Sequence, residues 1–522
     1  MRLRTAAVAA AALLLVGAAG CTDITTEPES SVTGSNIFND PSSYRAFLAK
    51  IYGGLQVTGQ QGPAGGADIE GIDEGFSHYL RQYWQLEELP TDEAVIGWGD
   101  DGLPELNTQL WGAANPFLAA MYYRIFFQVS LVNEFLRETT DQKLQGRNAG
   151  TDLVNQVHQY RAEARFLRAL SYWHGIDLFG NVPLVTEDFQ IGATPPTQST
   201  RAEVFNFVVS ELNAIRGSLP AAGAGEYGRA DRGAVDMLLA KLYLNAGVYT
   251  GTPRLADALV AVQNVIGSGA YSLDPSYRHL FLADNNTSDE IVFAVPSDGA
   301  HTRTWGGMTF LVHAAVGGNM NSANYGIDGG WWGLRVRPEV YNLYSAGDAR
   351  GAFFFTSGQT NDIGSIGNFN DGVGAPKYSN VTSGGQPGSN ATFPDTDFPM
   401  FRLADAYLMY AEIFLRGGGG TQAQALAYVN ALRQRAYGNA TGNITAAQLT
   451  LPFIKDERAR ELFWEAHRRT DLIRFGTYTT AGIWQWKGGV KPGKVTEAFR
   501  DLYPIPSSEL LANPNLTQNA GY

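Results

Sequence analysis

The sequence predicts a mostly α-helical protein: a scaffold of tetratricopeptide-like helical hairpins with a long irregular part. Two amphipathic stretches, Arg402–Leu415 and Gln422–Tyr437, are separated by the glycine run Gly417–Gly420. Together they have about the length of one tetratricopeptide hairpin, roughly 34 residues. Residues 290–400 instead carry Gly, Asn, Ser, Thr and aromatic residues, with only short strand-like pieces. Because long irregular regions of compact proteins usually carry function, we expect a functional role for this region.

The first 20 residues have the pattern of an export signal. A basic start is followed by an apolar run from Ala6 to Val16 and then by small residues up to Gly20. The run is too short for a comfortable transmembrane helix. Cys21, the sole cysteine, follows Gly20 directly and resembles the lipidated first residue of a bacterial lipoprotein. We therefore expect lipid attachment at Cys21; an ordinary secretory signal is the alternative.

The charge balance argues against a nucleic-acid ligand. The chain has 38 basic and 51 acidic residues, and removal of residues 1–20 takes away two of the basic ones. The mature protein then has 36 basic residues against 51 acidic ones, a net charge of −15 with His neutral. Such a surface repels phosphates. It is compatible with a neutral ligand.

Four segments are expected in order along the chain: signal peptide (1–20), flexible tether (21–41), a helical part (42–289) and a second part (290–522). The second part holds the loop-rich region and the late helices, and we expect both parts to form one intertwined domain. Asp231 is a plausible N-cap for one of the helices. The predicted helices are Ser42–Val57, Phe117–Arg137, Leu153–His174, Arg201–Ser218, Arg232–Val248, Arg254–Ser268, Arg402–Leu415, Gln422–Tyr437 and Leu451–Phe475.

The stretch from Arg161 to Glu187 predicts a core helix followed by a turn. Phe166, Leu170 and Trp173 recur at helical spacing, so one side of the helix is apolar. We expect this helix to end near Gly175. No residue in it is placed for chemistry.

Four segments in the same order resemble the SusD/RagB family of nutrient-binding outer-membrane lipoproteins. They are AEARFLRALSYWHGIDLFGNVPLVTE (162–187), FRLADAYLMYAEIF (401–414), DERARELFWEAHRRTDLIRFG (456–476) and LYPIPSSELLANPNLTQNAGY (502–522). The resemblance implies a SusD-like fold whose irregular part carries the ligand site. It also implies a lipid-anchored protein of the outer membrane, facing the cell surface, that captures oligosaccharides for a SusC-like TonB-dependent transporter. Some members resemble peptide binders, so a peptide-binding lipoprotein of the same fold is an alternative.

Tryptophans beside glycines are the candidate ligand-binding residues. Trp98, Trp305, Trp331 and Trp332 all lie in such loop segments. A flat indole offers an apolar face to the C–H side of a sugar ring. In glycan-binding relatives an arc of aromatics comes from three corresponding segments, which implies Trp98, Trp305 and Trp331 or Trp332 here. The alternative is that these rings cap the helical scaffold.

Carboxylates on the predicted late helix raise the alternative of a glycoside hydrolase. Glu457, Glu461 and Glu465 follow one another at i, i+4 spacing, and a glycosidase needs two carboxyl groups near one bond. Interleaved arginines favour ionised structural carboxylates instead. We expect the ion pairs Glu465–Arg469 and Arg468–Asp471, and no enzyme activity. A tetratricopeptide adaptor that only holds partner proteins is a further alternative.

No cofactor is expected. Gly488–Lys494 imitates a phosphate-binding loop, but Val495 stands where the magnesium-ligating Ser or Thr is required. Asp284–Glu290 offers oxygen ligands for calcium without the spacing of a known calcium loop, so a polar turn is the favoured interpretation.

Overall fold

A computed structural model describes residues 37–59, 62–63, 66–190, 192 and 194–522. The predicted signal peptide, the lipidation site Cys21 and most of the predicted tether lie outside these residues. Within the described part of the chain, no helix has both the length and the apolar character needed to cross a membrane.

Helices are the main regular secondary structure of the described chain, and the strands are short. The helices are α3 (Ser42–Gly53), α4 (Tyr79–Glu88), α5 (Leu103–Thr108), α6 (Pro116–Glu138), α7 (Asp141–Gly146), α8 (Thr151–Leu178), α9 (Arg201–Ile215), α10 (Arg232–Leu244), α11 (Ala246–Thr250), α12 (Leu255–Gly267), α13 (Gly307–Ala314), α14 (Pro338–Tyr341), α15 (Leu403–Leu415), α16 (Gln422–Tyr437), α17 (Leu451–Glu461), α18 (Arg468–Arg474) and α19 (Ser507–Ala512). The strands are β1 (Ala94–Ile96), β2 (Val182–Pro183), β3 (Gln198–Ser199), β4 (Ile291–Val295), β5 (Leu334–Val336), β6 (Val373–Gly374) and β7 (Phe398–Arg402).

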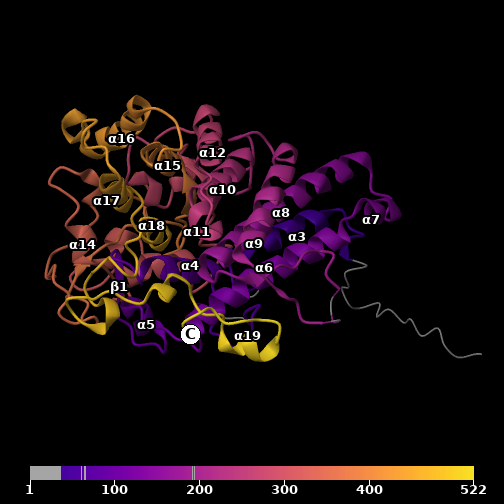
Figure 1. The fold of residues 1–522 in the computed structure, drawn as a ribbon, viewed down its shortest axis with the longest axis horizontal. Helices are drawn as coiled ribbons and strands as arrows, with labels where there is room; N and C mark the ends of the chain where they lie inside the picture. Colours follow the sequence, from indigo (N-terminus) through magenta and orange to yellow (C-terminus); the bar gives the residue numbers. More distant parts are fainter. Residues whose placement is uncertain (1–36, 60–61, 64–65, 191, 193) are drawn as a thin grey trace, which may run out of the picture.

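The helices pack as neighbouring pairs. α6 lies against α8, α8 against α9, α10 against α12 and α15 against α16. α12 also packs on α15 and so joins the earlier helices to the later ones. Figure 1 shows α6 and α8 running toward the end of the molecule that carries α7, while α14 to α18 build the opposite end. Asp231 caps α10 as predicted, because its side chain accepts a hydrogen bond from the amide of Ala234 at 2.9 Å.

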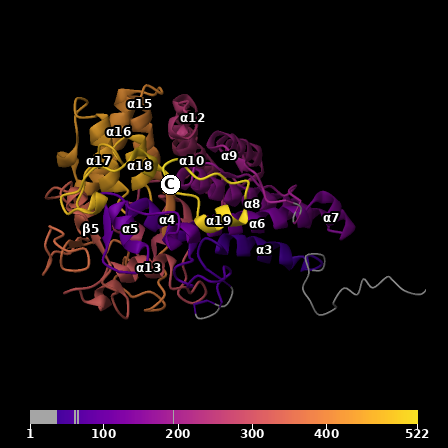
Figure 2. The same ribbon diagram turned by 60° about the horizontal axis from the view of Figure 1, so that its bottom comes forward.

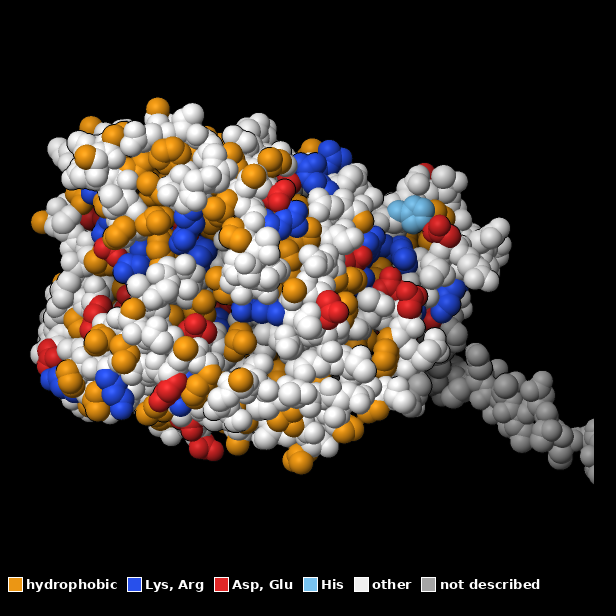
Figure 3. Space-filling model, in the orientation of Figure 1, with side chains coloured by type: hydrophobic (Ala, Val, Ile, Leu, Met, Phe, Trp, Pro, Cys, Tyr) orange, Lys and Arg blue, Asp and Glu red, His pale blue; other side chains and the backbone are white. Residues whose placement is uncertain are grey.

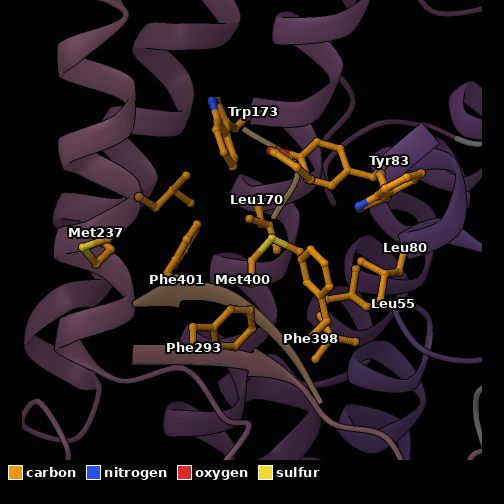
Figure 4. Packing of buried hydrophobic residues seen from close by; sticks show 14 of the residues in the cluster. Leu55, Leu80, Tyr83, Leu170, Trp173, Met237, Phe293, Phe398, Met400 and Phe401 are labelled. Atoms are coloured by element: carbon orange, nitrogen blue, oxygen red, sulfur yellow. The ribbon is translucent and has the colours of Figure 1, made fainter. Parts of the chain in front are cut away.

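The buried core is centred on the predicted face of α8. Leu170 and Trp173 of α8 lie close to Tyr83 of α4 and to Phe401 of β7 (Figure 4). Trp173 and Phe401 have ring centroids 6.3 Å apart. Burying an aromatic or aliphatic side chain of this size contributes about 1.5–3 kcal/mol to stability. The two-stranded sheet of β4 and β7 is therefore held against the helices by its own aromatic side chains.

The predicted end of the α8 helix near Gly175 is wrong. The helix continues to Leu178, and the amide of Phe179 still donates to the carbonyl of Gly175 at 2.9 Å. Ile176 and Leu178 are buried, so packing sustains the helix beyond the glycine. The chain then turns at Gly180, where φ is +75°.

The predicted single helix Leu451–Phe475 is also wrong, because it is broken between α17 and α18. Trp464 and Ala466 both have φ of 58°, a left-handed conformation that costs non-glycine residues energy. Tertiary contacts stabilise this conformation. The amide of Trp464 donates to the carboxylate of Glu93 at 2.9 Å, and the Trp464 ring lies edge to face with Trp84, with ring centroids 5.4 Å apart.

Several helices were not predicted, among them α4 and α13. Every residue of α4 is buried, including the polar Arg81, Gln82 and Gln85. α13 lies inside the region 290–400, where helices were not expected, and all of its residues are buried too. Both helices lie at the end of the molecule that also holds α5 and β5 (Figure 2).

Candidate tryptophan site

The pairing of two short strands brings Trp98 and Trp331 together. β1 runs antiparallel to β5, with Ile96 opposite Leu334. The residues just after β1 therefore lie beside the residues just before β5. The amide of Gly97 donates to the carbonyl of Gly333 at 3.0 Å, and the indole Nε1 of Trp98 donates to the carbonyl of Trp331 at 3.1 Å.

Helix α13 brings in the third tryptophan. Trp305 lies two residues before α13, and the segment 331–333 lies along the end of the same helix. The amide of Trp331 donates to the carbonyl of His313 at 2.8 Å. On the other side of Trp305, its own amide donates to the Glu74 carboxylate at 2.9 Å. The backbone around each ring is thus fixed by the protein.

Three indoles form one continuous run, which we call the tryptophan arc (Trp98, Trp331 and Trp305). The ring centroids of Trp98 and Trp331 are 6.3 Å apart, with 45° between the ring planes. Those of Trp331 and Trp305 are also 6.3 Å apart, with 47° between the planes. Since each ring is tilted relative to the next, the arc presents a bent rather than a flat surface.

The rings of the arc differ in exposure. Trp305 is 42% exposed and rests on Phe393, with centroids 5.2 Å apart. Trp98 and Trp331 are half-buried. Trp331 stacks on His313 at 4.8 Å, and the His313 ring nitrogens lie 2.6 and 2.9 Å from two backbone carbonyl oxygens. The rings of the arc therefore pack against the protein on one side and remain partly exposed on the other. They fit both interpretations of these residues, ligand binding and capping of the helical scaffold.

Trp332 lies apart from the arc. Its ring is 53% exposed and pairs with Phe369 at 5.8 Å. Its backbone has φ of 57°, which turns the chain between two successive tryptophans. Of the two neighbours predicted as alternatives, the structure places Trp331 beside Trp98 and Trp305.

Glycines make room for the arc. A Cβ atom at Gly333 would lie 2.7 Å from the ring of Trp98. A Cβ atom at Gly306 would lie 2.3 Å from the side chain of His78, which caps α4. The glycines beside the tryptophans thus allow close packing under the rings, which is a more specific role than local flexibility.

Arg81 of α4 lies beside the arc and was missed by sequence reasoning. Its guanidinium carbon is 4.4 Å from the centroid of Phe310 and 5.9 Å from that of Trp98. The residue is 4% exposed, and its Nε and Nη2 have no hydrogen-bond partner among the described residues. Burial lowers the pKa of Arg81 to about 10, partly opposed by the charges of Asp100 and Asp73. It remains a cation at neutral pH.

Comparison with known proteins identifies the family. A family model described as the SusD family matches residues 354–522. The starch-binding protein SusD of Bacteroides thetaiotaomicron is 34% identical to this chain over 98% of both proteins. The chain belongs to the SusD family. The resemblance stated from the sequence is thereby confirmed.

Solved structures confirm the mostly α, SusD-like fold. The surface glycan-binding protein A from Bacteroides fluxus superposes with a TM-score of 0.71 at 22% identity, covering 92% of this chain and 99% of that one. The surface glycan-binding protein A from Bacteroides thetaiotaomicron, in complex with laminarihexaose, gives 0.69 at 20% identity, with 92% and 99% covered.

The carboxylates once considered for hydrolysis are structural in this SusD-family protein. Glu457 and Glu461 are fully buried on α17, and Arg350 bonds both, at 2.9 and 3.0 Å. Burial would raise the pKa of Glu461, but Arg435 and the arginines beside it outweigh that effect and hold it at about 2. A general acid needs the opposite shift. Together with family membership, this makes the chain a binding protein and not an enzyme.

The predicted ion pairs of the late segment are wrong. Glu465 lies beyond the end of α17 and pairs with Arg402 at 2.6 Å and with Lys377 at 2.7 Å, not with Arg469. Arg469 instead bonds Asp177 at 2.7 Å. Similarly, Arg468 pairs with Asp92 and Asp471 with Arg458. The break at Trp464 separates Glu465 from the helix that carries Arg469. Arg468 and Asp471 share α18, but each pairs with a residue outside that helix.

No metal site is evident in the described part of the chain, where no group of three or more His, Cys, Asp or Glu side chains could hold an ion. In the predicted polar turn, the Asp284 carboxylate accepts from the amide and hydroxyl of Ser383. The loop that imitates a phosphate-binding motif is largely exposed between Gly489 and Val495. Figure 3 shows acidic and basic side chains interspersed over one face of the molecule.

Proposed function

We propose that this SusD-family protein captures a glycan on the tryptophan arc. The observation that carries the proposal is the continuous run of three indoles, each tilted by about half a right angle from the next. Indole faces stack on the apolar sides of successive sugar rings, and a tilted run follows a chain that curves. The guanidinium of Arg81, 5.9 Å from the ring centroid of Trp98, adds a positive charge beside the arc.

The favoured ligand is a starch-type α-glucan. The relative at 34% identity is named a starch-binding protein, whereas the neighbour in complex with laminarihexaose is 20% identical. A curved arc also suits a glucan that coils. We therefore expect malto-oligosaccharides to bind more tightly than laminarihexaose.

We further infer where the protein works. An acyl chain on Cys21 would hold it to the outer membrane, facing the cell surface. The segment 22–36 and the residues up to α3 would act as the tether. As in the family it resembles, the protein would pass oligosaccharide to a SusC-like TonB-dependent transporter for nutrient uptake. Affinity purification of the tagged lipoprotein from membranes should recover a large barrel protein.

Calorimetry with maltoheptaose, laminarihexaose and a mixture of peptides tests which class of ligand the protein binds. Binding of maltoheptaose that weakens in Trp305→Ala, and persists in Trp332→Ala, is the expected result. Trp332 is the matched control because it is an exposed tryptophan that lies outside the arc. Binding of peptides in place of both glycans would reject the proposed function.

A further inference from the structure

Another exposed aromatic ring, which is not part of the tryptophan arc, lies between two cavities. Tyr227, in the loop between α9 and α10, is 44% exposed. One cavity of about 510 Å³ and another of about 330 Å³ are both lined by Tyr227 and Pro296. The two cavities therefore meet at this ring. We call them together the Tyr227 groove.

The ring of Tyr227 is held in place by the protein. Its hydroxyl donates to the Asp397 carboxylate at 2.7 Å, and the same carboxylate accepts from the amide of Ser297 at 2.7 Å. Gly228, with φ of +75°, lets the loop approach Pro296, since a Cβ atom there would lie 2.4 Å from the proline ring. A ring that is already fixed loses little conformational freedom when a ligand stacks on it.

Polar groups suited to hydroxyls line the larger cavity. Asp395 accepts from the amide of Gly299 at 2.8 Å and from the amide and hydroxyl of Ser389. A carboxylate has about four acceptor sites, so Asp395 keeps capacity for a further donor. Asp298 and His301 also line this cavity, and the described residues around it include no Lys or Arg. The larger cavity can therefore accept hydrogen bonds from sugar hydroxyls.

The Tyr227 groove borders the tryptophan arc through a shared segment. Phe393 supports Trp305 with ring centroids 5.2 Å apart. Ser389 and Asp395, on either side of Phe393 in the chain, line the groove. His301 lines it as well and precedes Trp305 by only a few residues. One glycan chain leaving the arc at Trp305 can therefore reach the groove.

We propose that the Tyr227 groove is a second glycan subsite, which binds an adjoining stretch of the same neutral polysaccharide that occupies the arc. This inference rests on the proposed function. Linked subsites raise the affinity for a long chain because the second contact is intramolecular once the first has formed. A short oligosaccharide that fills only the arc gains nothing from the groove.

The test compares a short and a long probe, maltotriose and soluble starch, on three variants. Tyr227→Ala should bind maltotriose like the wild type and soluble starch about tenfold more weakly. Tyr227→Phe keeps the ring but loses the hydrogen bond to Asp397. It should bind maltotriose like the wild type and lose much less affinity for soluble starch than Tyr227→Ala does. Tyr428→Ala on α16 removes a partly exposed ring outside the groove and should change neither affinity.

The outcomes separate this inference from the function on which it rests. If Tyr227→Ala binds soluble starch as tightly as the wild type, and the arc still binds maltotriose, the proposed subsite in the groove is rejected and the proposed function is not. An equal loss in Tyr227→Phe and Tyr227→Ala would also overturn it, because the freed Asp397 and not the missing ring would then be the cause. Failure of the wild-type protein to bind either probe would overturn both the proposed function and the groove.

Discussion

The indole nitrogen of Trp98 donates a hydrogen bond to the backbone carbonyl of Trp331, at 3.1 Å, across 233 residues of sequence. This bond ties the first ring of the arc to the backbone of the second. It acts together with the β1–β5 pairing, which brings the two segments to the same place. The spacing of the rings is thus set by main-chain contacts, and a ligand meets a surface that is already formed.

Loss of the most exposed ring of the arc should weaken binding without unfolding the protein. Trp305→Ala should cost about 1–3 kcal/mol of binding free energy, by analogy with bases stacked on aromatics. The melting temperature should barely change, because the ring is 42% exposed. Trp98→Ala should lower both affinity and melting temperature, since that ring is half-buried and hydrogen-bonded. Calorimetry beside thermal melts checks this; unchanged affinity in Trp305→Ala would exclude the ring from the site.

The lipid anchor can be tested at Cys21. Cys21→Ser should move the protein from the membrane fraction to the soluble fraction, because the sole thiol available for acylation is gone. Thr22→Ser leaves that thiol in place and serves as the matched control. Fractionation and mass spectrometry of the amino-terminal peptide are the measurements. Retention of Cys21→Ser in the membrane, with no lipid on the wild-type peptide, would contradict the anchor.

Acid should destabilise the protein through Glu457 and Glu461. The pKa of each is held at about 2 in the folded protein, below its ordinary value of 4.5, because the neighbouring arginines outweigh the effect of burial. The stability that they contribute is therefore complete above about pH 4.5 and is lost as pH falls through about 2. Glu461→Gln should lower stability at neutral pH by about 3–5 kcal/mol, since buried arginines lose a partner.

Urea unfolding at pH 7 and pH 3 measures this effect. The difference between wild type and Glu461→Gln should shrink at the lower pH. Neither protein should release reducing sugar from starch. Activity in the wild type that disappears in Glu461→Gln would show that this carboxylate is catalytic after all.

Alkaline pH should weaken the fold through the buried pair Glu88 and Glu93. Burial raises the pKa of Glu93 to about 8, and burial together with the charge of Glu93 raises that of Glu88 well above its usual value. The folded pKa values exceed the unfolded ones, so the native state holds protons that the unfolded chain has lost. Stability should therefore fall as pH rises from about 4.5 through about 8.

The variant Glu88→Gln tests whether this pair causes the loss of stability at alkaline pH. A glutamine keeps the size of the carboxylic acid and a donor toward Glu93 but cannot ionise. Melting temperatures between pH 5 and pH 9 should fall less steeply in Glu88→Gln than in the wild type. Glu226→Gln, at an exposed ion pair with Arg45, should follow the wild-type slope. Parallel slopes for wild type and Glu88→Gln would show that the pair is not the source.

Local periodicity and family segments determined much of this protein from the sequence alone. Phe166, Leu170 and Trp173 face the core because their spacing matches one helix turn after another, and this spacing is visible without a structure. The glycine-flanked tryptophans also stood out as candidates, since a large ring beside glycine lacks local packing. The resemblance to the family followed from four segments that occur in the family's order along the chain.

The tertiary structure decided what depends on distant partners. Trp331, not Trp332, joins the arc because the β1–β5 register and the left-handed turn at Trp332 set which ring meets Trp98. Arg81 reaches the arc from α4, whose residues are all buried by contacts with other elements. The late helix breaks at Trp464 because contacts with Glu93, 371 residues away, outweigh local helix propensity. Sequence spacing reports neighbours along one element, whereas these features arise from contacts between elements.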